Sequence, residues 1–119
     1  MNGDTLVIPE LFRRVLQPDF AWTPYRPGVD IHRLYGKGDG GPSAALLHYA
    51  PGASIPKHSH QGYEHIFVLH GTQVDIRGTH AAGTLVVNPP GSSHEVNSPG
   101  GCIVLVIWER PIAFITSTG

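Results

Sequence analysis

The chain has 119 residues and a net charge of −1, and 14% of its residues are charged. This length suits one domain with a single hydrophobic core, expected over residues 1–119. The charge balance supplies neither a basic surface for nucleic acid nor a polybasic patch for a membrane, so the expected partners are small molecules or a second copy of the chain.

Cysteine content and hydropathy restrict the class further. The single cysteine, Cys102, excludes an intramolecular disulfide framework. The longest apolar run, Cys102 to Trp108, is too short to span a bilayer. The first residues lack a cationic stretch followed by an apolar block, so we expect no secretory signal and a cytoplasmic location.

The first segment of the chain is ambiguous. Residues 4–17 form either a short helix with Pro9 in its first turn or an extended arm. The aromatic and proline-rich residues that follow, around Trp22, indicate an extended segment laid across a sheet. We therefore expect residues 1–28 to form an N-terminal arm and residues 29–116 to form the main domain.

The remainder of the chain alternates apolar runs with glycine and proline turns. The 11 prolines and 15 glycines favour short strands over long helices. Gly71 is expected to end one strand, and Val74 and Ile76 are expected to point inward from the next. The expected strands cover residues 29–35, 43–50, 65–70, 72–77, 84–87 and 102–109, with residues 111–116 closing the chain. About eight or nine short strands predict an all-β barrel or a double-sheet jelly roll.

A cluster of metal-ligating residue types follows Gly52. In a strand, side chains two residues apart leave the same face, so His58 and His60 can direct two imidazoles at one ion. A turn at Gly62 would return Glu64 beside them, and His94 is the expected fourth ligand. Imidazoles with one carboxylate suit a divalent transition metal such as iron, zinc, nickel or manganese.

These residues resemble a known pair of motifs. Gly52, His58, His60, Glu64 and Gly71 match the first cupin motif, G-x5-H-x-H-x3-E-x6-G, at every fixed position. The second motif, G-x5-P-x-G-x2-H, is matched by Gly83, Pro89, Gly91 and His94. Looser similarity over roughly residues 20 to 110 resembles the ChrR-like branch of the RmlC-like cupin superfamily.

The resemblance implies a cupin double-stranded β-helix, or jelly-roll barrel, with the N-terminal arm outside it. It also implies one divalent transition metal per chain. Small cupins commonly form dimers through their N-terminal segments, so the arm is assigned to a homodimer contact. The alternative is that the arm covers its own barrel.

Two functions follow from the resemblance. The first is a cupin dioxygenase that acts on a diketone, enol or phenolic substrate, with Glu64 as a ligand or as a catalytic base. The second is a non-enzymatic metal-binding or sensing cupin, related to the zinc-binding domain of anti-sigma factors, in which tetrahedral zinc uses all four side chains.

The substrate pocket is expected to involve residues on the strands beside the ligands. One of His48 and Tyr49 must face the barrel interior, because they are adjacent in a strand. The candidate pocket residues are His48, Tyr49, Ile66, Val68 and Trp108. Cys102 is either a redox-sensitive thiol near the site or a small buried hydrophobe, and the second is favoured.

Overall fold

The computed structural model describes residues 3–115, and within them the chain forms ten strands and one short helix, α1 (Leu11–Arg14). Residue 116, the expected end of the barrel, lies outside the described residues. The strands are β1 (Thr23–Arg26), β2 (Val29–Tyr35), β3 (Ser43–Tyr49), β4 (Ala53–His60), β5 (Glu64–Asp75), β6 (Gly78–Ala81), β7 (Leu85–Asn88), β8 (Ser93–Ser98), β9 (Cys102–Trp108) and β10 (Ile112–Phe114). No helix within the described residues is long and apolar enough to cross a membrane.

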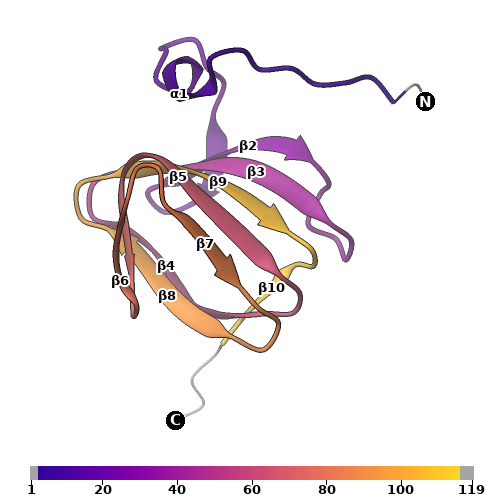
Figure 1. The fold of residues 1–119 in the computed structure, drawn as a ribbon, viewed down its shortest axis with the longest axis vertical. Coiled ribbons are helices and arrows are strands. Elements are labelled where there is room, and N and C mark those ends of the chain that lie inside the picture. The colour runs from indigo at the N-terminus through magenta and orange to yellow at the C-terminus, as the bar shows by residue number, and fades with distance from the viewer. Residues whose placement is uncertain (1–2, 116–119) are drawn as a thin grey trace.

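The strands form one antiparallel sheet that curls into a barrel (Figure 1). Its order is β1-β2-β3-β9-β5-β8-β4-β10, and β6 and β7 also pair with β5. The first half of β5 pairs with β9 and β7, whereas its second half pairs with β6 and β8. This long strand therefore belongs to both walls of the barrel, and the expected all-β jelly-roll class is confirmed.

The main core lies inside the barrel. Alternate residues of β3 and β9 point inward, and Leu47, Tyr49, Val104 and Val106 are each at most 2% exposed. Such alternation follows from the strand pleat, which sends successive side chains to opposite faces. The barrel interior along these two strands is therefore mostly apolar.

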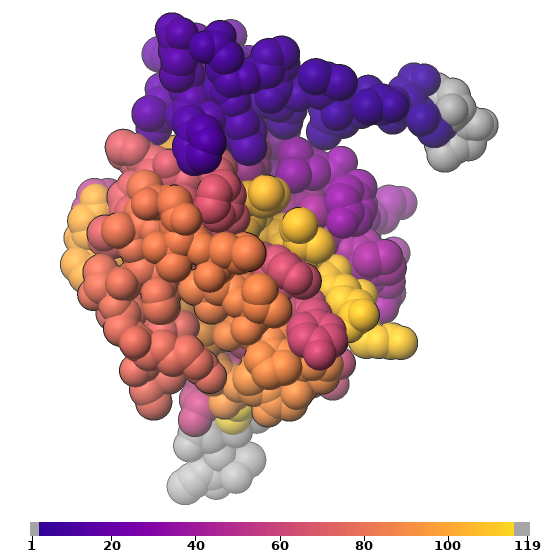
Figure 2. Space-filling model, in the orientation of Figure 1, coloured from indigo at the N-terminus to yellow at the C-terminus, as the bar shows by residue number. Residues whose placement is uncertain are grey.

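A second, smaller core covers the outside of the sheet. Val15 and Phe20, which follow α1, pack on Leu46, Leu69 and Ile103, the outward-facing residues of β3, β5 and β9. Burial of such side chains contributes about 1.5–3 kcal/mol each. The N-terminal segment thus covers its own barrel, as Figure 2 shows for the indigo atoms above the sheet.

The strand expected to end at Gly71 instead continues to Asp75, and this expectation is wrong. A β-bulge lies between Val68 and His70, where β5 has one residue more than β9. A bulge of this kind inverts the alternation of faces beyond it. Residues 73 and 75 therefore point inward in place of the expected Val74 and Ile76, and Ile76 is 86% exposed.

We expect Gly71→Ala to lower the free energy of unfolding by about 2–4 kcal/mol. Gly71 has φ +74°, and an added Cβ would collide with the Gly101 carbonyl oxygen and lie 2.9 Å from Cys102 Cα. Gly38→Ala is the matched control, because Gly38 has φ +73° with no atom within 4 Å of the added Cβ. It should cost about 1 kcal/mol from backbone strain alone. Equal urea midpoints for the two variants would contradict this account of Gly71.

Candidate metal centre

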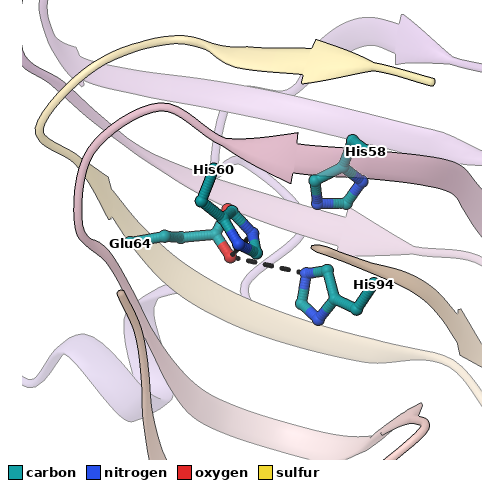
Figure 3. Close-up of side chains that lie close together, drawn as sticks. All are labelled: His58, His60, Glu64 and His94. Carbon is teal, nitrogen blue, oxygen red and sulfur yellow. Dashed lines mark ion pairs between the residues drawn. The ribbon is translucent and has the colours of Figure 1, made fainter. Parts of the chain in front are cut away.

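Three strands bring together the four expected ligands (Figure 3). His58 and His60 project inward from β4, and His94 on β8 is paired directly with His58. Glu64 begins β5 after the break at residues 61–63. One ligand atom from each side chain lies within 4.8 Å of the others, and each residue is at most 4% exposed.

Hydrogen bonds behind the rings fix how the imidazoles are protonated. His58 Nδ1 lies 2.9 Å from the Pro56 carbonyl oxygen, which only accepts hydrogen bonds, so this nitrogen carries the proton. Ser92 donates its hydroxyl proton to the Pro89 carbonyl, so it accepts a hydrogen bond from His60 Nδ1 at 2.8 Å. Both rings therefore present an unprotonated Nε2 to the cluster.

His94 follows the same rule through a carboxylate. Its Nδ1 donates to Asp75 Oδ2 at 3.1 Å. Asp75 Oδ1 also accepts hydrogen bonds from the Arg77 backbone N–H and from His80 Nε2, each at 2.9 Å. Burial raises the pKa of Asp75, but His80 and His94 outweigh it and lower that pKa below its ordinary value. A charged carboxylate therefore holds the His94 ring in place.

The unprotonated Nε2 atoms of His60 and His94 lie close to the Glu64 carboxylate, with no proton between them. His60 Nε2 lies 2.9 Å and His94 Nε2 3.5 Å from Glu64 Oε1. Among the described residues, both Nε2 atoms are buried without a hydrogen-bond partner. Lone pairs facing a carboxylate in a water-poor interior repel one another and are costly to bury. A cation between them would remove that cost, so the donor set fits a divalent metal.

The pKa shifts of Glu64 and His94 also indicate that positive charge is favoured between the carboxylates. Burial raises the pKa of Glu64, but His60 and His94 outweigh it and lower that pKa well below its ordinary value. For His94, burial lowers the pKa, while the neighbouring carboxylates of Glu64 and Asp75 raise it to a net value above the ordinary one. Without a metal, a proton on His94 therefore supplies positive charge between the two carboxylates.

Glu64 is held by two further donors. Asn88 Nδ2 donates to Oε1 at 3.0 Å, and the Trp108 indole N–H donates to Oε2 at 2.8 Å. Trp108 had been expected as pocket wall, whereas Asn88 was missed. The two hydrogen bonds fix the carboxylate so that Oε1 faces the histidines and Oε2 faces away from them.

A small cavity of about 20 Å³ adjoins the cluster. Such a volume holds about one water molecule. Tyr49, Ile66 and Trp108 of the expected pocket residues line it, together with Gln73, which was not expected. Val68 is buried in the core and does not line the cavity.

The two adjacent candidates of β3 face opposite ways. His48 lies on the outer face, where its ring centroid is 5.2 Å from that of Trp22. Tyr49 points inward and accepts a hydrogen bond from Gln73 Nε2 at 3.3 Å. Burial, followed by the charges of Cys102 and Glu64, raises the pKa of Tyr49 well above its ordinary value. Its hydroxyl therefore stays neutral and, with the Gln73 amide, is a polar group in the lining of the small cavity.

The thiol of Cys102 is buried away from the ligands. It lies in the main core rather than in the lining of the small cavity. Burial raises the pKa of Cys102 to about 11, so the thiol stays protonated near neutral pH. A protonated, buried thiol is poorly reactive, as expected of a cysteine that serves as a small hydrophobe.

The residues behind the ligands left little signal in the sequence. Asp75 and Gln73 were assigned to the outer face because the bulge was not foreseen. Ser92 and Asn88 are common turn residues beside two prolines, and nothing local shows that they face a buried ligand. Asn88 is the one buried residue of β7, and because Val87 and Pro89 beside it are exposed, no pattern of neighbouring residues marks it.

Solved structures share this fold. A cupin-like protein of unknown function from Ralstonia eutropha JMP134 is 26% identical with a TM-score of 0.69, and the match covers 77% of this chain and 61% of that one. A chain in the complex of Rhodobacter sphaeroides SigE with the anti-sigma ChrR is 27% identical with a TM-score of 0.68, covering 76% of this chain and 50% of that one. This chain thus spans half to about three fifths of the length of these relatives.

A third structure matches the chain from end to end. Acetylacetone dioxygenase from Acinetobacter johnsonii has a TM-score of 0.78 at 17% identity, and the match covers 100% of this chain and 82% of that one. At this identity the likeness establishes the fold alone. No curated protein sequence matches the chain. The model of the ChrR cupin-like domain matches residues 14–112, and the chain therefore belongs to the ChrR cupin-like family.

Proposed function

We propose that the protein is a mononuclear metal cupin that oxidises a small diketone, enol or phenolic substrate with dioxygen. The observation that carries this proposal is the set of unprotonated imidazole nitrogens aimed at the buried Glu64 Oε1 beside a small cavity. His58, His60 and His94 would hold the metal together with Glu64. As iron(II), the metal would supply Lewis acidity and the redox chemistry that dioxygen requires.

The protein's own groups have separate tasks in this proposal. Glu64 acts as a ligand rather than a mobile base, because Asn88 and Trp108 occupy its carboxylate oxygens. The neutral Tyr49 hydroxyl donates a hydrogen bond to an oxygen atom in the cavity. The apolar walls exclude bulk water, which strengthens each of these interactions.

A non-enzymatic sensing role is the second candidate. Four side chains that converge on one point can saturate a tetrahedral zinc and leave no position open. A relative at 27% identity occurs in a complex of a sigma factor with its anti-sigma factor. The zinc form would then serve structure or signalling, and the small cavity would have no substrate to hold.

We also propose a cytoplasmic homodimer formed through the arm. Leu6 and Val7 are 60% and 71% exposed, although both are apolar. A second copy of the chain would bury them. The near-neutral net charge of −1 supports small molecules rather than nucleic acid or membrane lipid as further partners.

The purified protein should contain about one divalent metal per chain, and His58→Ala or His94→Ala should remove most of it, because each loses a converging nitrogen. Metal content is measured by inductively coupled plasma mass spectrometry. His70→Ala is the control, because His70 is exposed and lies outside the cluster. Equal metal content in the wild type and both ligand variants would refute the site.

Acidification should release the metal between about pH 5 and 6.5, because a protonated imidazole cannot ligate. Once the metal has left, His94 should take up its proton at a higher pH than His58, because Glu64 and Asp75 outweigh burial and raise the pKa of His94, whereas burial lowers the pKa of His58. Retained metal is measured after dialysis at each pH. Full retention at pH 4 would be inconsistent with a site built on these histidines.

The iron form should consume oxygen when it is mixed with 2,4-pentanedione or a phenolic ketone, and the zinc form should not, because only iron supplies electrons to dioxygen. An oxygen electrode measures the rate, and Tyr49→Phe should slow it about tenfold or more by removing the cavity hydroxyl. Native zinc that does not exchange, with no oxygen uptake by the iron form, would favour the sensing role.

A further inference from the structure

A second, wider pocket lies next to the small cavity. It has a volume of about 220 Å³, below the range of about 300–1,000 Å³ that holds drug-sized ligands. Tyr25, Trp108 and Ile112 line both spaces and form the partition between them. A ligand of a few heavy atoms in the wider pocket would therefore lie against the same side chains that enclose the metal centre.

Two cations line this pocket. On β2, Val29 and Ile31 face the barrel interior, and Arg33 lies two residues beyond Ile31. The strand pleat puts Arg33 on that same inward face, where its side chain is exposed and lines the pocket. Lys37 contributes the second charge from the hairpin that follows β2.

Within the described residues, neither Arg33 nor Lys37 has an acidic partner. The lining contains no aspartate or glutamate. Among residues 3–115, no ion pair or hydrogen bond engages the side chain of Arg33 or Lys37, and Asp39 in the same hairpin does not line the pocket. Two uncompensated cations beside aromatic and aliphatic walls attract an anion more strongly than cations in open water would.

A third cation, Arg26, adds positive charge beside the pocket. The guanidinium carbon of Arg26 lies 3.7 Å from the ring centroid of Phe114, which lines the pocket. Arg26 Nε is buried, and within the described part of the chain it has no hydrogen-bond partner. The wall that carries Phe114 is thus positively charged as well.

We propose that this pocket binds the carboxylate of an anionic substrate, so that a small oxygenated acid is the preferred substrate and a neutral diketone binds more weakly. This inference rests on the proposed function for its reactive end. The carboxylate pairs with Arg33 and Lys37, the carbon skeleton packs on Tyr25 and Phe114, and the oxygenated end reaches the partition at Trp108 and Ile112.

The test compares two ligands that differ in one group. 2,4-Dioxopentanoate has a carboxylate where 2,4-pentanedione has a methyl group. Binding to the full chain, as purified, is measured by calorimetry without oxygen, so that no turnover is needed. We expect 2,4-dioxopentanoate to bind about tenfold or more tightly than the neutral diketone, with an affinity that falls as salt is added.

Charge-removing variants locate the effect. Arg33→Gln and Lys37→Gln should each weaken the binding of 2,4-dioxopentanoate by about tenfold and leave the binding of 2,4-pentanedione unchanged. Both residues are exposed, so the variants should fold, which thermal melts would verify. Arg13→Gln is the control, because Arg13 pairs with Glu10 on α1 and lies outside the pocket.

The outcomes separate the two proposals. Equal affinity for both ligands, or a preference that survives in Arg33→Gln and Lys37→Gln, overturns the anion site. A carboxylate preference that the two variants abolish supports the anion site, even when the iron form consumes no oxygen. A failure of the iron form to consume oxygen would overturn only the oxygenase proposal.

Discussion

The orientation of three imidazoles by hydrogen bonds on their outer nitrogens is the constraint on which the centre depends. The Pro56 carbonyl, the Ser92 hydroxyl and the Asp75 carboxylate each accept a hydrogen bond from Nδ1 of a different ring. The Nε2 lone pairs consequently converge on Glu64, with which they share no proton. A divalent cation would resolve this arrangement, and a protonated His94 is the substitute when the metal is absent.

The residues of β5 that hydrogen-bond to His94 and Tyr49 depend on an irregularity in that strand. The bulge between Val68 and His70 inverts the faces of β5, and only after that inversion does Asp75 reach His94 and Gln73 reach Tyr49. The same strand supplies Glu64 at its start. One irregularity in β5 therefore lets Asp75, the carboxylate behind His94, point inward from the same strand as Glu64.

The side chains of Tyr25, Trp108 and Ile112 separate the metal centre from the wider pocket. A cavity of about 20 Å³ touches the ligands, whereas the pocket of about 220 Å³ beyond it carries the charges. The apolar residues that surround the metal ligands are not the residues that carry positive charge in the wider pocket. The residues that could hold a metal and those that line the wider pocket are thus different, so the two can vary independently.

The sequence by itself determined most of the strands, the turns and the four residues that could hold a metal, because these depend on local periodicity and on residue types at short spacing. His58 and His60 share a face in any regular strand, and His94 follows a rigid turn in a recognisable motif. The groups behind the ligands, the inward turn of Asp75 and the cover that Val15 and Phe20 provide were decided only by the tertiary structure. They depend on pairings between distant strands, and a single added residue in one strand reverses which side chains face inward.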